Sequence, residues 1–74
     1  MALRDWKKIK GKLEWFKKDG SKSIWILKAG WDMSGRRTYN ADVYDYKERE
    51  IVDSSPIMTK SKVITWVKNY MRRH

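Results

Sequence analysis

The chain has 74 residues, of which 41% are hydrophobic, and a formal net charge of +9. A chain this short has room for one hydrophobic core, so we expect a single domain over residues 1–74. It contains no cysteine, which excludes disulfides and thiolate metal sites and is typical of a reducing compartment. No stretch resembles a signal peptide or reaches the length of a membrane span, so we expect a cytoplasmic protein without membrane contact.

The positive charge is concentrated at the two ends of the chain. Residues 1–28 contain nine Lys/Arg and three Asp/Glu, residues 29–58 contain four and six, and residues 59–74 contain five and none. The three segments therefore carry +6, −2 and +5, which sum to +9. Basic ends on a small domain attract polyanions such as nucleic acid or an acidic protein. A well-solvated lysine-rich surface is the alternative interpretation.

The first predicted element is a strand over residues 9–15, where apolar or small residues alternate with charged ones. Residues 1–8 are expected to be frayed or to form a short helical turn. A helix over residues 3–18 is the competing interpretation, because the apolar positions also fit a helical spacing, but Gly11 disfavours it. The Asp19-Gly20 pair that follows predicts a hairpin turn, since both residues tolerate a positive φ.

Three further strands are predicted downstream. The apolar run over residues 23–31 is typical of a strand covered on both faces. A loop with its bend at Gly35 leads to a third strand over residues 37–47, where apolar and polar residues alternate. A turn precedes a short fourth strand over residues 50–54. These elements predict an antiparallel sheet over residues 9–58.

A C-terminal helix is predicted over residues 59–74. Apolar residues recur there at helical spacing, Thr59 or Ser61 can cap the N-terminus, and Lys and Arg occupy the last turn. The expected fold is therefore α+β: a small antiparallel sheet of three to four strands followed by one helix packed on one face, in the order β-β-β-β-α. This element order is similar to that of the integrase DNA-binding domains that contact DNA through a sheet. It is also similar to that of single-strand-binding transcriptional coactivators. The resemblance covers element order alone and implies no residue roles.

Five tryptophans in a chain this small raise the question of which rings form the core. If the loop around Asp19-Gly20 has an even number of residues, Trp15 lies opposite Ile24 and shares the helix-facing side of the sheet with it. Phe16 and Trp25 then point to the other face, among lysines, where no predicted element covers them. A loop with an odd number of residues would exchange the two faces.

Exposed rings among lysines are typical of proteins that bind single strands or unstacked bases. Lysine and arginine neutralise phosphates, while the rings stack on bases. We therefore predict a non-enzymatic nucleic-acid-binding protein, with DNA or RNA as its partner. The predicted contact residues are Lys10, Lys12, Phe16, Lys17, Lys18, Lys22, Trp25, Arg36 and Arg37. The alternative is a protein-interaction module that binds an acidic partner or forms a homodimer through the uncovered face.

Residues suited to catalysis are few. The only histidine is His74, the last residue, and without cysteine the usual nucleophile–base pairs are missing. The carboxylates between residues 42 and 53 match no metal-binding spacing, and no glycine-rich phosphate loop is present. We therefore expect no enzymatic activity, no metal and no cofactor.

Overall fold

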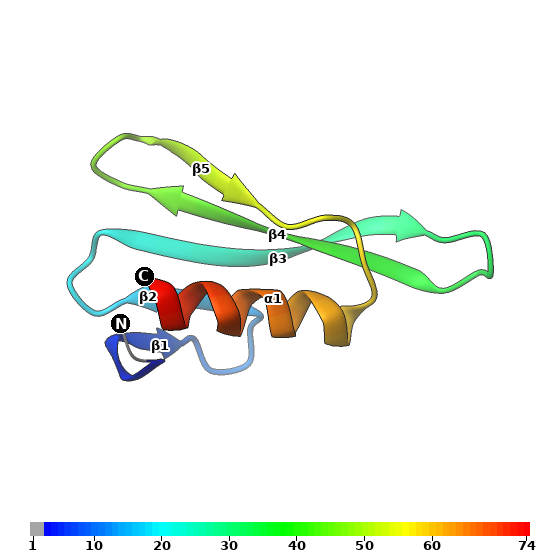
Figure 1. Ribbon diagram of the computed structural model, residues 1–74, viewed down its shortest axis with the longest axis horizontal. Helices are drawn as coiled ribbons and strands as arrows, with labels where there is room; N and C mark the ends of the chain where they lie inside the picture. Colours follow the sequence, from blue (N-terminus) through cyan, green and yellow to red (C-terminus); the bar gives the residue numbers. More distant parts are fainter. Residues whose placement is uncertain (1–2) are drawn as a thin grey trace.

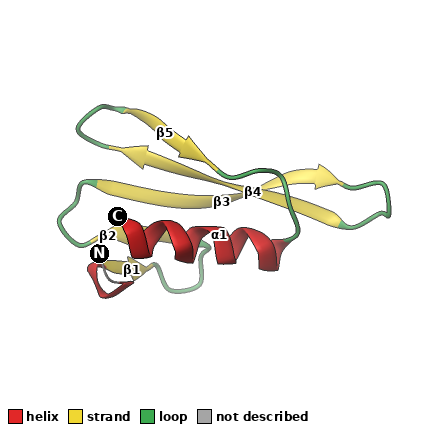
Figure 2. Ribbon diagram, viewed as in Figure 1, coloured by secondary structure: helices red, strands yellow, loops and turns green. Residues whose placement is uncertain are grey.

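The computed structural model describes residues 3–74 and contains a five-stranded antiparallel sheet with one α-helix on one face (Figures 1 and 2). The elements are a 3-10 turn η1 (Leu3–Asp5), strands β1 (Trp6–Lys8), β2 (Glu14–Lys17), β3 (Lys22–Trp31), β4 (Arg37–Asp45) and β5 (Glu50–Ser54), and helix α1 (Lys60–Arg73). The strands follow one another across the sheet in chain order. The predicted α+β class and C-terminal helix are confirmed. The sequence predicted three to four strands, and the structure has five.

The additional strand lies at the N-terminus, where the sequence had predicted a frayed end or a short helical turn. Its residue Trp6 pairs with Lys17 of β2. The strand predicted over residues 9–15 is interrupted by a turn over residues 9–13, in which Gly11 has a φ of 78°. Glycine adopts this left-handed conformation without a steric penalty, so the chain reverses at Gly11 instead of continuing as a strand. Residues 1 and 2 of the predicted frayed end lie outside the described residues.

The hairpin between β2 and β3 has a loop of even length. Residues 18–21 connect the two strands, and Trp15 pairs with Ile24. The Asp19 carboxylate accepts hydrogen bonds from the backbone N–H and the hydroxyl of Ser21, at 2.9 and 2.6 Å. These bonds fix the turn locally and hence the register of everything that follows. The side-chain arrangement predicted for an even loop is confirmed.

The hydrophobic core lies between α1 and the sheet face that bears Trp15. Ile24 and Val43 from the sheet meet Val63 and Val67 from the helix, and all four are fully buried. Removing such side chains from water stabilises the fold by about 1.5–3 kcal/mol each. Among the described residues, the buried hydrophobic core comprises Trp6, Trp15, Ile24, Ala41, Val43, Val63, Val67, Tyr70 and Met71.

Strands β3 and β4 form a long hairpin that projects past the start of α1 (Figure 1). The molecule is elongated as a result, with extents of 40 × 23 × 22 Å. The tip of this hairpin is the predicted loop, with Gly35 at its bend, and next to it the Arg37 guanidinium lies 4.3 Å from the ring centroid of Trp31. No helix within the described range is long and apolar enough to cross a membrane.

Candidate nucleic-acid interface

The sheet face opposite α1 carries the rings that the sequence left uncovered. Phe16 on β2 pairs with Ser23 on β3, and Ser23 pairs in turn with Tyr44 on β4. Trp25 stacks on Tyr44 with ring centroids 6.1 Å apart, and Tyr44 meets Tyr46 edge-on at 5.0 Å. Phe16 is 36% and Tyr46 50% exposed. The helix packs on the other side of the sheet (Figure 1), and it therefore does not cover these rings.

The two residues paired with Trp25 across the sheet are carboxylates. Trp25 pairs with Glu14 on β2 and with Asp42 on β4. Asp42 accepts hydrogen bonds from the Asn40 amide at 3.2 Å and the Ser54 hydroxyl at 2.8 Å, so its position is fixed. A phosphate placed over Trp25 would meet two negative charges. The lysines expected around this ring lie elsewhere.

Most of the predicted phosphate-binding residues lie in three separate turns. Lys10 and Lys12 are exposed in the turn between β1 and β2, and Lys18 is exposed in the turn between β2 and β3. Arg36 and Arg37 lie at the tip of the β3–β4 hairpin, with Arg37 stacked on the nearby indole. These five residues are therefore not gathered around Phe16 and Trp25 as one contact surface.

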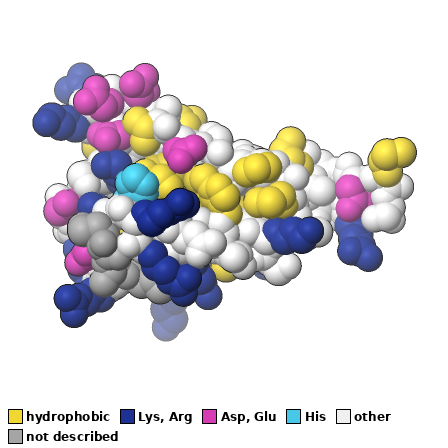
Figure 3. All heavy atoms as spheres, viewed as in Figure 1, with side chains coloured by type: hydrophobic (Ala, Val, Ile, Leu, Met, Phe, Trp, Pro, Cys, Tyr) yellow, Lys and Arg dark blue, Asp and Glu magenta, His cyan; other side chains and the backbone are white. Residues whose placement is uncertain are grey.

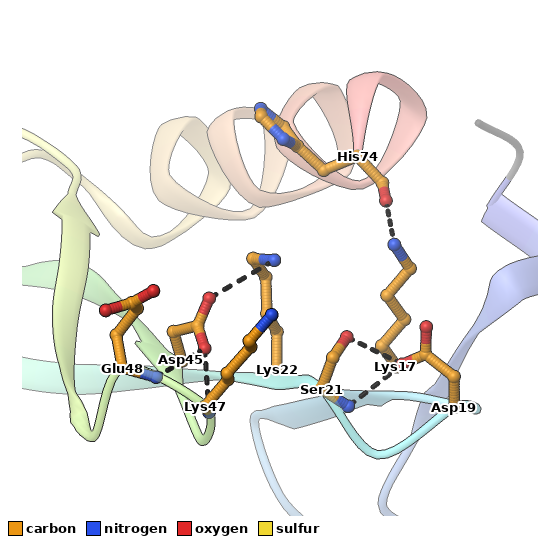
Figure 4. A network of polar contacts seen from close by, with 8 residues as sticks. All are labelled: Lys17, Asp19, Ser21, Lys22, Asp45, Lys47, Glu48 and His74. Atoms are coloured by element: carbon orange, nitrogen blue, oxygen red, sulfur yellow. Dashed lines mark hydrogen bonds and ion pairs between the residues drawn. The ribbon is translucent and has the colours of Figure 1, made fainter.

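The remaining two predicted cations, Lys17 and Lys22, lie on the helix side and have partners (Figure 4). The Nζ of Lys17 donates to the backbone oxygen of His74. The Nζ of Lys22 lies 3.4 Å from a carboxylate oxygen of Asp45. A hydrogen bond from the backbone N–H of Glu48 is the main cause that lowers the pKa of Asp45 below its ordinary value of 3.8. Both lysines thus tie parts of the fold together.

A basic groove follows the outer surface of α1. A shallow hollow of about 380 Å³ beside the first half of the helix is lined by Met58, Ser61, Lys62, Thr65, Trp66 and Asn69. A second hollow of about 310 Å³ is lined by Asn69, Arg72 and Arg73. Because Asn69 borders both, the two hollows adjoin along the helix. We call this feature the α1 groove, defined by these eight residues.

The charge of α1 is one-sided. The helix contains five Lys/Arg and no Asp/Glu. Arg72 and Arg73 in the last turn suit the helix dipole, whereas Lys60 and Lys62 lie in the first turn, where the dipole disfavours cations. Helix stability therefore does not explain the two lysines. They have a cost of a few tenths of a kcal/mol that a polyanionic ligand would offset.

Asn69 positions the two arginines at the C-terminal end of the groove. The Nη1 of Arg72 donates to the Asn69 side-chain oxygen at 3.2 Å, and the Nε of Arg73 donates to the Asn69 backbone oxygen at 3.3 Å. Each guanidinium has five N–H donors, so each retains several for a ligand. A planar guanidinium matches the oxygens of a phosphate in a two-point contact.

Trp66 forms the aromatic wall of the groove. Its ring stacks on that of Tyr70, with centroids 5.7 Å and planes 19° apart, and Tyr70 stacks on His74 at 4.1 Å and 14°. The three rings are four residues apart, so they form one column along the helix. Burial, together with the charge of Arg73, lowers the pKa of His74, which favours its neutral ring in the stack.

Two further lysines lie beside α1 in a separate pocket, which shares no residue with the α1 groove. Lys8 and Lys68 line a pocket of about 230 Å³ together with Trp6, Trp15 and Met71. The indole Nε1 of Trp6 is buried and has no hydrogen-bond partner among the described residues. Figure 3 shows dark-blue side chains around the helix, whereas most of the visible acidic side chains lie toward the β4–β5 end.

The residues of the α1 groove are not among the contact residues predicted from the sequence. A signal was present, because residues 59–74 carry five positive charges and no negative ones. Apolar residues at helical spacing indicate a core-facing side of the helix, and the structure places the Trp66 ring partly in the core and partly in the groove. Lys62, Arg72 and Arg73 are the contacts that this signal could have identified.

Comparison with protein-family models, with curated proteins and with solved structures gave no significant match. Within residues 3–74, no group of three or more His, Cys, Asp or Glu side chains is arranged to hold a metal ion. A functional proposal therefore rests on the residues of this chain and their geometry.

Proposed function

We propose that the protein is a non-enzymatic nucleic-acid-binding protein that contacts phosphates through the α1 groove. The observation that carries this proposal is that α1 has five basic residues and no acidic ones. Three of the basic residues line a groove on the outer surface of the helix. From Lys62 to Arg73 the helix rises about 16 Å, which provides an extended row of cations. Charge of this kind supplies affinity that does not depend on base sequence.

This proposal relocates the contact surface. The far face, defined by Phe16, Trp25, Leu27, Tyr44, Tyr46 and Ile51, has Glu14 and Asp42 beside its central ring. The residues that line the α1 groove include no carboxylate. Because phosphate is repelled by carboxylate, the groove is the better polyanion surface of the two. A cytoplasmic location stays a prediction.

Binding of a fluorescently labelled oligonucleotide at low salt tests the proposal. The variant Arg72→Gln/Arg73→Gln removes two groove cations, and Lys47→Gln/Arg49→Gln removes two exposed cations from the β4–β5 turn. Both variants lose the same net charge. We expect the groove variant to bind much more weakly and the control to bind nearly as the wild type does. Absence of binding by the wild type, or equal loss in both variants, would contradict the proposal.

A protein-interaction module is the second candidate, and the far face favours it. Leu27 is 45% and Ile51 51% exposed, and together with the aromatic residues they form an apolar surface larger than isolated exposed residues would give. The carboxylates beside Trp25 would suit a basic group on the partner. In a homodimer through this face, Glu14 and Asp42 of the two copies would approach one another, which is unfavourable.

Sedimentation velocity tests the homodimer form of the second candidate. A dimer that persists at high salt and dissociates in the Trp25→Ala variant would establish the far face as a homodimer interface. A monomer at all salt concentrations would exclude the homodimer.

A further inference from the structure

The two faces of the Trp66 ring have different neighbours. Tyr70, one helical turn further on, stacks against one face with nearly parallel planes. The hollow beside Trp66 runs past the ring in both directions along the helix, from Met58 and Lys62, one turn earlier, to Asn69 on the C-terminal side. Residues four apart follow one another along a helix, so the part of the hollow beside Lys62 lies on the side of the ring that Tyr70 does not cover.

We propose that this hollow receives an unpaired nucleobase, so that the ligand of the α1 groove is a single strand. The inference rests on the proposed function and names its ligand class. A base in the hollow would extend the column formed by Trp66, Tyr70 and His74 by one ring. The volume of about 380 Å³ lies in the lower part of the range of roughly 300–1,000 Å³ that small-molecule sites occupy.

The other lining residues suit a base and its phosphate. Ser61 and Thr65 supply hydroxyl groups, and the Thr65 hydroxyl donates to the Ser61 carbonyl at 3.1 Å, which leaves its lone pairs available as acceptors. Lys62 lies at the same hollow as a phosphate contact, and Arg72 and Arg73 continue the positive charge beyond Asn69. A base on Trp66 would therefore have cations on both sides along the helix.

A duplex cannot use this site without disruption. Both faces of a base in a duplex are covered by its neighbours, so only an unpaired or flipped base can stack on a protein ring. Stacking depends on the π-face that all bases share, so we infer little sequence preference. A duplex would contact only the cations of the groove.

Two substitutions of Trp66 separate stacking from packing. Trp66→Leu keeps an apolar side chain against the core but has no ring, and Trp66→Phe keeps a ring. We expect the affinity for a short oligothymidine to fall by about tenfold or more in the Leu variant, and by less in the Phe variant. The affinity for a duplex of the same charge is expected to stay unchanged in both. Thermal unfolding confirms that each variant is folded.

The outcomes distinguish this inference from the proposed function. Absence of binding to either strand form by the wild type would overturn both. Single-strand binding that Trp66→Leu leaves unchanged, or a duplex affinity that falls equally, would overturn the inference alone. If the Leu variant does not fold, the indole N–H resonance of Trp66 in the wild type gives the answer. It should shift on addition of oligothymidine and stay in place with the duplex, and an unmoved resonance in both would overturn the inference.

Discussion

The salt dependence of binding measures how many phosphates the protein neutralises. Lys62, Arg72 and Arg73 line the α1 groove, which gives three cations. For a single strand, the logarithm of the binding constant falls with the logarithm of salt concentration by about 0.7 for each neutralised phosphate. Three contacts predict a slope of about −2.1, which is roughly a 20-fold loss of affinity from about 50 to 200 mM salt.

Removal of two of these three cations should reduce the slope to about one third. The Arg72→Gln/Arg73→Gln variant is expected to show a slope of about −0.7, so that the same change in salt weakens binding about 3-fold. Fluorescence anisotropy of a labelled oligothymidine at four salt concentrations gives the slope directly. The control variant Lys47→Gln/Arg49→Gln should keep the wild-type slope. An unchanged slope in the arginine variant, or an equal decrease in the control, would refute phosphate binding by the groove.

The remaining predictions concern the fold. Trp15 is 7% exposed, so Trp15→Ala should lower the free energy of unfolding by about 3–5 kcal/mol. Trp25→Ala loses mainly the stack with Tyr44, so it should lower the free energy of unfolding by about 1 kcal/mol. Urea denaturation measures the loss in both variants. Equal losses would show that the assignment of sheet faces is wrong. Arg49 has a φ of 58°, a left-handed conformation that costs a residue with a side chain about 1–2 kcal/mol but costs glycine little. Arg49→Gly should therefore raise the unfolding temperature, and a decrease would contradict that reasoning. The pKa of Asp32 is lowered from 3.8 by hydrogen bonds, first from the Arg36 backbone and then from the Ser34 hydroxyl. Its ionised form is therefore favoured in the folded state, and its contribution to stability is complete above pH 3.8 and lost as the pH falls through the lowered folded-state value. Asp32→Asn should reduce the acid sensitivity measured by denaturation between pH 5 and about 2, and an unchanged acid profile would count against this role.

The sequence predicted those elements whose boundaries are set by local chemistry. The hairpin turn at Asp19-Gly20 and the bend at Gly35 both lie where the backbone has a positive φ, and the helix at the C-terminus has a clear apolar periodicity. Strand β1 was missed because three residues are too few to show a period. Gly11 was ambiguous, since its place within an alternating pattern does not reveal that the chain reverses there.

The candidate site was harder to predict because it depends on neighbours from distant parts of the chain. Trp25 has lysines near it in sequence, but its neighbours across the sheet are Glu14 and Asp42, which only the strand register determines. Alternation along the strands places Lys17 and Lys22 on the helix side, where each has a partner. The hollow beside Trp66 likewise depends on how the segment before α1 packs against the helix, which the sequence pattern does not contain.

An NMR titration with a short single strand tests the central claim most directly, because it reports which surface is used. Backbone and indole resonances can be followed for the α1 groove and the far face in one experiment. We predict that Lys62, Trp66 and the two arginines of the groove shift as the strand is added, whereas Phe16 and Trp25 do not. Shifts confined to Phe16, Trp25 and their neighbours, with the groove unchanged, would contradict the claim.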